Sequence, residues 1–471
     1  MNDTDLAFTS ALEQAQLIRR GQVSPLELTQ LYCDRIAQLN PRLGSFFYVA
    51  QEQAIAEAQA KTEQLTQIAP QNLPPFFGVP TAIKDLNPVA GMPFTCGNLA
   101  LKDNIAQYDE GVVQKIKGAG FTLLGKTAAS EFGAWPYVEP PGFPPSRNPW
   151  NLDYTSGGSS GGAASAVAAG LCAVAQGSDG GGSIRTPAAC CGIVGLKPSR
   201  GRVTHAPAGD YLNGIATDGI LTRTVADAAA LLDVMSGYVV GDPYWLPAPP
   251  QPFLEALKHP PQSLRIAFST SITPIGPASE PCQQAVRQTV QHLADLGHHL
   301  TEASPDFTGL TEPFIRVWQA GTAFSGLPLE ALSPMNQWLV QQAGSAGDYL
   351  QAVVQMQVIA RQIVAFFESF DLLVLPVHLH APPRVGEWAN LSPEATLEKI
   401  IQWIAPCPGV NAAGLPAIAL PVLFDPQGLP IGVQLVGKPA DDATVLAVAA
   451  QLEQRQPWIQ HRPSESLGLT E

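Results

Sequence analysis

The sequence lacks any run of about 18 apolar residues, which is the length that a helix needs to cross a membrane. The apolar stretch at residues 163–175 is too short and is interrupted by glycine and serine. Residues 1–5 are acidic and lack the basic segment and apolar core of a signal peptide. We therefore expect a cytoplasmic protein that does not associate with a membrane.

Positive charge is also scarce. Lysine and arginine number 26 against 40 aspartates and glutamates, so the formal net charge is −14 at pH 7. An acidic chain is a poor partner for nucleic acid or for an anionic membrane. We expect neither as a partner.

Cysteine is sparse, and its pattern excludes a disulfide framework. The chain has seven cysteines, an odd number at scattered positions, which is typical of free thiols in a reducing compartment. The adjacent pair Cys190 and Cys191 has no second Cys or His pair at the spacing of metal ligands. We read this pair as small buried side chains and expect no metal site.

What the chain does contain is an alternation of helical and strand patterns over 471 residues, 45% of them hydrophobic. Such alternation predicts an α/β fold with a helix-covered sheet to which both halves of the chain contribute. A proline-rich segment at residues 242–252 is the best candidate for a subdomain junction. The expected helices are two within residues 8–40, then 51–68, 111–117, 163–169, 224–236, 280–296 and 442–454; the expected strands are 78–83, 121–124, 171–176, 264–268, 372–376, 417–421 and 432–436.

Three segments carry the chemistry. Lys84 ends the predicted strand in Gly-Val-Pro-Thr-Ala-Ile-Lys-Asp. Ser159 lies in the turn Ser-Gly-Gly-Ser-Ser-Gly-Gly, and Ser183 in Gly-Ser-Asp-Gly-Gly-Gly-Ser-Ile-Arg. A serine hydroxyl needs a base to become a nucleophile, and lysine serves as one only when burial lowers its pKa. Together these residues supply a base, a proton relay and a nucleophile for cleaving an amide or ester without histidine.

Each segment alone has an ordinary interpretation. A Gly/Ser turn is commonly a flexible connection, and a Lys-Asp pair is commonly a solvated charge. A phosphate-binding loop is a poor alternative, because no Gly-Lys-Ser/Thr follows at the required spacing. The combination of all three segments in this order favours a catalytic site.

In these motifs the chain resembles the amidase signature family of serine hydrolases, over about residues 8–458. The resemblance implies a large mixed β-sheet covered by helices on both faces. It also implies a single amidase domain over residues 1–471, with a helical N-terminal part (1–70), a core with the catalytic motifs (71–240) and a C-terminal part that completes the sheet (241–471). The matching segments are residues 78–85, 90–93, 125–127, 148–151, 157–162, 181–185, 187–188, 195–198, 414–417 and 428–437.

The resemblance also implies roles. Ser183 corresponds to the acyl-forming nucleophile, Ser159 to a middle serine after a cis peptide from Gly158, and Lys84 to the base. The family needs no metal or organic cofactor. The remaining implied residues are the oxyanion-hole N–H groups of Gly180, Gly181, Gly182 and Ser183, and the supporting polar residues Ser160, Asp179 and Arg185.

At two positions this chain differs from many members of the family. Many members have Thr or Ile where this chain has Gly180, and the form here resembles the branch that contains 6-aminohexanoate-cyclic-dimer hydrolase. In residues 127–132, Ala128 follows Thr127 where Asn is common, which leaves the hydrogen bonding to substrate there open.

The function expected from this resemblance is hydrolysis of a non-peptide carboxylic acid amide, linear or cyclic, through an acyl-enzyme. The expected partner is a small-molecule amide, and a monomer and a homodimer both stay open. Two alternatives remain: the A subunit of a glutamyl- or aspartyl-tRNA amidotransferase, and a catalytically silent binding scaffold. Aromatic candidates for the pocket, equally compatible with plain core positions, are Trp135, Tyr137, Phe143, Trp318 and Trp403, whereas His378 and His380 are interpreted as structural.

Overall fold

The computed structural model describes residues 2–210 and 212–463, and Met1, Tyr211 and residues 464–471 lie outside the described part. Its centre is an eleven-stranded sheet with the strand order β1-β3-β2-β6-β8-β7-β14-β15-β13-β9-β12. These strands are β1 (Phe46–Val49), β2 (Pro80–Lys84), β3 (Thr122–Thr127), β6 (Val174–Asp179), β7 (Val194–Lys197), β8 (Thr217–Thr222), β9 (Arg265–Phe268), β12 (His299–Glu302), β13 (Leu372–Pro376), β14 (Ala417–Phe424) and β15 (Pro430–Gly437).

The sheet is mixed, and it joins the two halves of the chain. Strand β2 runs parallel to both β3 and β6, whereas β6, β8, β7, β14, β15 and β13 are antiparallel to their neighbours in that order. The pairing of β7 with β14 connects the N-terminal and C-terminal strands, so the prediction that both halves form one sheet is confirmed. Two small hairpins lie outside it: β4 (Arg147–Asn148) with β5 (Asn151–Thr155), and β10 (Ser271–Ile272) with β11 (Gly276–Pro277).

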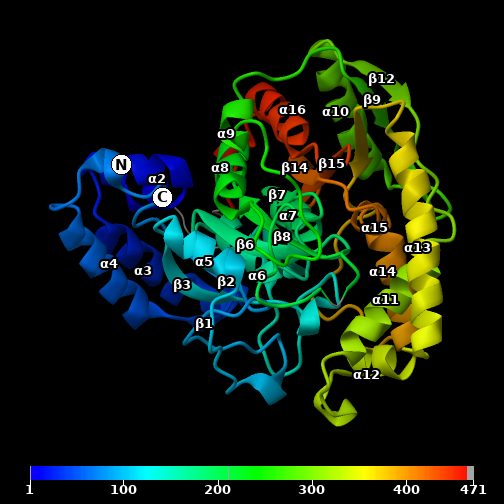
Figure 1. Cartoon of the computed structure of the whole chain (residues 1–471), viewed down its shortest axis with the longest axis horizontal. Helices are drawn as coiled ribbons and strands as arrows, with labels where there is room; N and C mark the ends of the chain where they lie inside the picture. The colour runs from blue at the N-terminus through cyan, green and yellow to red at the C-terminus, as the bar shows by residue number, and fades with distance from the viewer. Residues whose placement is uncertain (1, 211, 464–471) are drawn as a thin grey trace.

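Helices cover both faces of the sheet (Figure 1). One layer contains α6 and α7, which pack on each other and on the central strands, and the other contains α8, α10 and α16. The helices are α1 (Asp3–Ala7), α2 (Ala11–Arg19), α3 (Pro25–Leu43), α4 (Gln51–Gln64), α5 (Gly111–Gly118), α6 (Gly161–Ala168), α7 (Arg185–Cys191), α8 (Val225–Met235), α9 (Phe253–Ala256), α10 (Glu280–Asp295), α11 (Thr311–Ala323), α12 (Pro334–Gln341), α13 (Ala346–Phe366), α14 (Pro393–Ile404), α15 (Pro408–Ala412) and α16 (Asp442–Arg455).

Local sequence explains where these elements begin and end. Helix α3 starts with a capping box, because Ser24 Oγ accepts from the Glu27 N–H and the Glu27 carboxylate accepts from the Ser24 N–H. Pro25 occupies the first helical position, where its missing N–H costs nothing. The helix ends at Gly44, whose φ of 60° suits glycine. The predicted start of this helix is confirmed.

Some predicted boundaries and elements are wrong. The strand expected at residues 171–176 begins only at Val174, and the helix expected at residues 51–68 ends at Gln64. Helices α11 to α14 were not predicted. In helix α13, apolar residues such as Val354 and Val358 are exposed to solvent in addition to those that face the core. The helix therefore lacks the regular apolar and polar faces by which a helix is predicted.

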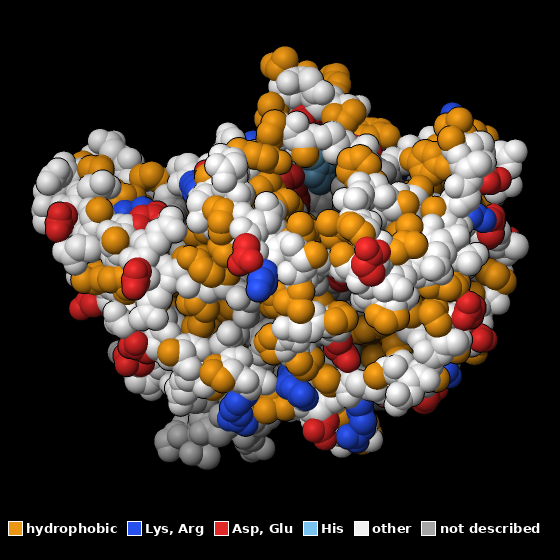
Figure 2. Space-filling view, turned by 90° about the horizontal axis from the view of Figure 1, so that it is seen from below, with side chains coloured by type: hydrophobic (Ala, Val, Ile, Leu, Met, Phe, Trp, Pro, Cys, Tyr) orange, Lys and Arg blue, Asp and Glu red, His pale blue; other side chains and the backbone are white. Residues whose placement is uncertain are grey.

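The surface agrees with the acidic composition. On the face drawn in Figure 2, lysine and arginine side chains are scattered among acidic and uncharged ones. The two ends of the described chain lie side by side (Figure 1), where Arg462 Nη1 is 2.8 Å from Asp5 Oδ1. Among the described helices, none is both long and apolar enough to cross a membrane.

Candidate active site

The site forms where two neighbouring parallel strands end. Lys84 is the last residue of β2, and Asp179 is the last residue of β6. Because β2 and β6 are parallel and adjacent, their carboxyl ends meet at the same edge of the sheet, the usual position of a site in α/β proteins. The turn that carries Ser183 follows β6 and leads into α7, and Ser159 lies just before α6.

The Lys84 amine is fully buried. Its Nζ lies 2.7 Å from Ser159 Oγ, 2.9 Å from Ser178 Oγ and 3.2 Å from the Ser178 carbonyl oxygen. Burial lowers the pKa of Lys84 from 10.5 to about 7, although the charges of Asp179 and Asp218 oppose this shift. The Ser178 carbonyl oxygen only accepts, whereas the two hydroxyl groups donate or accept, so these three contacts satisfy the amine both with and without its proton.

The two serines lie on adjoining segments. The peptide bond between Gly158 and Ser159 is cis, as the resemblance implied. The Ser160 N–H donates to the Ser183 carbonyl oxygen at 3.1 Å, which holds the two turns together. Within the described part of the chain, Ser159 Oγ bonds Lys84, and the Ser183 hydroxyl has no hydrogen-bond partner in the protein. Ser183 Oγ is therefore available to a ligand in the cavity that it lines.

The Asp179 carboxylate shapes the turn that carries Ser183. Its Oδ1 accepts from the Gly182 N–H at 2.8 Å, and its Oδ2 accepts from the N–H groups of Ile184 and Arg185 at 3.1 and 3.4 Å. Gly182 has φ of 121° and a Cβ there would lie 2.8 Å from Cys407 Cβ, so this turn requires glycine. The turn is thus folded around one carboxylate.

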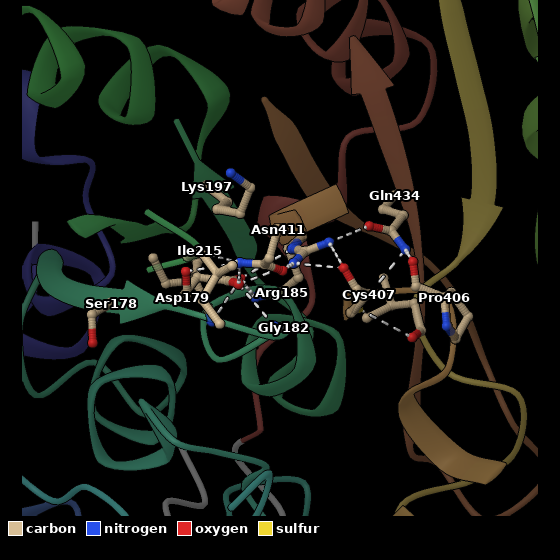
Figure 3. A network of polar contacts seen from close by, with 12 residues as sticks. Ser178, Asp179, Gly182, Arg185, Lys197, Ile215, Pro406, Cys407, Asn411 and Gln434 are labelled. Carbon is tan, nitrogen blue, oxygen red and sulfur yellow. Dashed lines mark hydrogen bonds and ion pairs between the residues drawn. The ribbon is translucent and has the colours of Figure 1, made fainter. Parts of the chain in front are cut away.

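Arg185 neutralises that carboxylate (Figure 3). Its Nε and Nη2 donate to Asp179 Oδ2 and Oδ1 at 3.0 and 2.9 Å, and both side chains are fully buried. Burial alone would raise the pKa of Asp179, but the Arg185 guanidinium holds it well below its usual range. Arg185 also donates to Gln434 Oε1 at 2.8 Å and to the Asn411 side chain. The C-terminal part of the chain therefore fixes the nucleophile turn.

Three backbone N–H groups of the turn have no acceptor among the described residues. They belong to Gly180, Gly181 and Ser183, whereas the Gly182 N–H is committed to Asp179. Of the four N–H groups expected for an oxyanion hole, three are therefore available to a ligand. Ser160, expected as a supporting residue, donates to the Ser178 carbonyl oxygen at 3.1 Å and accepts from the Ser178 N–H at 3.3 Å.

The cavity next to Ser183 is apolar. Gly181, Gly182 and Ser183 form part of its wall. No charged side chain lines it among the described residues. Most of its apolar surface comes from elements of the C-terminal half, including Phe307, Phe314, Trp318, Ile400 and Ile404, with Trp135 from the N-terminal half.

Trp318 explains the glycine at position 180. A Cβ on Gly180 would lie 3.0 Å from Cζ2 of Trp318, which is closer than most real Cβ contacts. A threonine or isoleucine at this position would therefore force the indole to move. The glycine and the large aromatic side chain form a matched pair on one wall of the cavity.

The other predicted aromatic residues have mixed positions. Tyr137 lines a neighbouring pocket and contacts Trp388 edge to face, at 5.6 Å between ring centroids. Phe143 packs on Phe47, and Trp403 is fully buried against the His378 ring, so neither lines the cavity next to Ser183. Burial lowers the pKa of His378 to about 3, which keeps this histidine neutral.

Sequence reasoning missed several residues of the site. Ser178 contacts the Lys84 amine, and Asn411 Nδ2 donates to Asp179 Oδ1 at 2.9 Å and to the Ile215 carbonyl oxygen at 3.0 Å. Ser178 was detectable, because it is the strand residue directly before Asp179. Asn411 and Gln434 gave no such signal, since they lie more than 200 positions beyond the turn.

The buried ion pair generates a stability prediction. Replacing Arg185 with Met leaves the Asp179 carboxylate buried without its cation, so we expect a loss of about 3–5 kcal/mol in the free energy of unfolding. Arg265→Ala is the control, because its pair with Asp371 lies at the surface, where solvent screens it, and is expected to contribute little to stability. Urea denaturation measures both. An Arg185→Met protein as stable as the control would contradict this role of the pair.

Known proteins are similar to this chain over most of its length. The family described as Amidase matches residues 27–446. A putative amidase of Synechocystis sp. is 59% identical over 460 residues, covering 98% of this chain and 91% of that protein. The 6-aminohexanoate-cyclic-dimer hydrolase of Paenarthrobacter ureafaciens is 34% identical over 494 residues, covering 98% of each. The solved structure of a 6-aminohexanoate cyclic dimer hydrolase complexed with substrate has a TM-score of 0.91 at 32% identity, covering 98% of this chain and 99% of that one.

These matches agree with the mixed, helix-covered sheet, and the range matched by the family, residues 27–446, includes Lys84, Ser159 and Ser183. They confirm the resemblance, the fold class and the reaction class, which is hydrolysis of amides. The chain belongs to the amidase signature family.

Proposed function

We propose that the protein hydrolyses a non-peptide carboxylic acid amide through an acyl-enzyme, with Ser183 as nucleophile, Ser159 as proton relay and Lys84 as base. The observation that carries the proposal is the fully buried Lys84 amine, 2.7 Å from Ser159 Oγ. A lysine without a stable charge is able to accept a proton near neutral pH, which is what a weak serine nucleophile needs.

In the acylation step, Ser183 Oγ bonds to the carbonyl carbon and passes its proton to Ser159, whose own proton moves to Lys84 Nζ. The carbonyl oxygen becomes an oxyanion facing the N–H groups of Gly180, Gly181 and Ser183, which donate to no acceptor within the described chain. When the C–N bond breaks, Ser159 gives its proton to the departing nitrogen and recovers one from the Lys84 ammonium.

In the deacylation step, a water molecule takes the position of the departed amine. Its proton passes through Ser159 to Lys84, and its oxygen bonds to the acyl carbon. Collapse of the second tetrahedral intermediate breaks the bond to Ser183 Oγ, which recovers a proton from Ser159, and Ser159 recovers one from the Lys84 ammonium. The carboxylic acid leaves, and the three groups return to their initial states.

The cavity favours a substrate whose group next to the scissile carbonyl is apolar and uncharged. Its lining is aromatic and aliphatic, with Trp135, Phe314 and Trp318 among the larger side chains and no charged group among the described residues. A charged substrate group would lose its hydration without gaining a partner. A bound glutamine, which the A subunit of an amidotransferase requires, would place an ammonium and a carboxylate in this environment, so the stand-alone amidase is favoured.

The direct test is hydrolysis of a panel of amides by the wild type and by two variants. The panel contains aliphatic amides, anilides and 6-aminohexanoate cyclic dimer, with amine or ammonia release as the readout. Ser183→Ala is expected to abolish turnover, and Lys84→Met to lower kcat by about 10²–10⁴-fold because the relay loses its base. Lys258→Met, at an exposed position, is the control and keeps wild-type turnover. Near-wild-type turnover by Lys84→Met would refute the mechanism.

The pH profile gives a second prediction. The base acts in its neutral form, so kcat/KM is expected to be high above pH 7 and to fall about tenfold per pH unit below it. The midpoint reflects the Lys84 pKa of about 7. Burial also lowers the pKa of Lys197 to about 7, so Lys197→Met is the necessary control and keeps the same profile. A profile flat down to pH 5, or one whose midpoint moves in Lys197→Met, would contradict the assignment.

A further inference from the structure

A second cluster of titratable side chains lies beside the active site and takes no part in the proposed reaction. Glu110 precedes α5, His205 lies in the loop between β7 and β8, and Asp218 is in β8. One ligand atom from each of the three lies within 4.8 Å of the others. We propose that Glu110, His205 and Asp218 bind one divalent transition-metal cation such as Zn²⁺.

The distances suit a small cation. His205 Nδ1 is 3.4 Å from Asp218 Oδ2 and 3.8 Å from Glu110 Oε1. Ligands at about 2.1 Å from a tetrahedral Zn²⁺ lie roughly 3.4 Å from one another. Imidazole nitrogen and carboxylate oxygen are both ligand atoms that Zn²⁺ takes in proteins. The remaining pair, Glu110 and Asp218, has its ligand atoms within 4.8 Å of each other.

In each carboxylate of the cluster, neighbouring amide side chains bind one oxygen and leave unbound the other oxygen, which faces His205. Asn87 Nδ2 donates to Glu110 Oε2 at 2.7 Å and to Asp218 Oδ1 at 3.0 Å, and Gln176 Nε2 donates to Asp218 Oδ1 at 2.8 Å. Asp218 Oδ2 is buried and has no hydrogen-bond partner among the described residues, in a side chain that is 1% exposed. Outer partners that orient the ligating carboxylates are typical of metal sites.

The charge of the cluster also points to a cation. Two carboxylates that are at least nine-tenths buried face one imidazole, and no lysine or arginine of the described chain pairs with either carboxylate. A buried carboxylate without a cationic partner is costly, so a divalent cation between Glu110 and Asp218 would stabilise this arrangement.

The backbone holds the three residues in place. The Gly111 N–H donates to the Ala206 carbonyl oxygen at 2.7 Å, which ties the His205 loop to the start of α5. Asp218 is opposite Ser178 in the β6–β8 register, and its partner Gln176 accepts from the Lys84 N–H at 3.0 Å. The His205 side chain is 31% exposed, which gives a cation a path from solvent. A bound cation would therefore join α5, the His205 loop and β8 next to the lysine strand.

The test measures binding of Zn²⁺ to the full chain, without substrate, by calorimetry after dialysis against a chelator. The wild type is expected to bind one equivalent that His205→Ala and Asp218→Asn lose, with the affinity of this site lowered at least about tenfold. His205 is the partly exposed ligand of the three, and circular dichroism shows that the His205→Ala protein is folded before its Zn²⁺ binding is measured. His299→Ala, which removes an exposed histidine on β12, is the control and keeps the equivalent.

A second readout is thermal unfolding. Zn²⁺ held by the folded cluster stabilises the folded state, so it is expected to raise the Tm of the wild type and of His299→Ala above the Tm that His205→Ala reaches at the same Zn²⁺ concentration. Absence of binding to the wild type, or an equivalent that persists in both His205→Ala and Asp218→Asn, would overturn the proposal. Because no substrate is involved, this result does not depend on whether the amidase mechanism is correct.

Discussion

The rest of the site depends on the buried Asp179 carboxylate. It accepts three backbone N–H groups from the turn around Ser183 and two N–H groups from the Arg185 side chain. A carboxylate so satisfied stays ionised in a dry environment, where each of these bonds is strong. Its bond with the Gly182 N–H commits that group, whereas the N–H groups of Gly180, Gly181 and Ser183 have no acceptor among the described residues. One ion pair thus determines both the shape of the turn and which donors a substrate meets.

The Lys84 amine is buried in the same dry region as Asp179, but burial has the opposite effect on its charge. Asp179 keeps its charge because Arg185 is adjacent, whereas the fully buried Lys84 amine forms no ion pair among the described residues and contacts only hydroxyl and carbonyl oxygens. Desolvation therefore lowers the pKa of Lys84 toward neutrality. Burying this amine destabilises the folded chain, and it produces a side chain that is able to act as a base near pH 7. The nearby Glu110, His205 and Asp218 cluster would add a cation to the same region without contacting the serines.

Much of the fold and the motif residues was predictable, because local patterns encode them. The strand that ends at Lys84, the two glycine-containing turns and the capping box at Ser24 all depend on residues close together in sequence. Ser178, Asn411 and Gln434 were not predictable in the same way. The last two reach Asp179 and Arg185 only because β7 pairs with β14, a contact between distant parts of the chain. Trp135 and Trp318 were candidates for the pocket and do line the apolar cavity, but its other residues were not predictable, since its walls come from both halves of the chain.

The measurement that tests the central claim most directly is intact mass after exposure to a fluorophosphonate, which reacts with an activated serine. The account predicts one adduct on the wild type, none on Ser183→Ala, and far slower labelling of Lys84→Met, because the Ser183 hydroxyl then lacks its base. An adduct on Ser183→Ala at the wild-type rate, or no adduct on a folded wild type, would contradict the assignment of Ser183 as a nucleophile activated through Ser159 and Lys84.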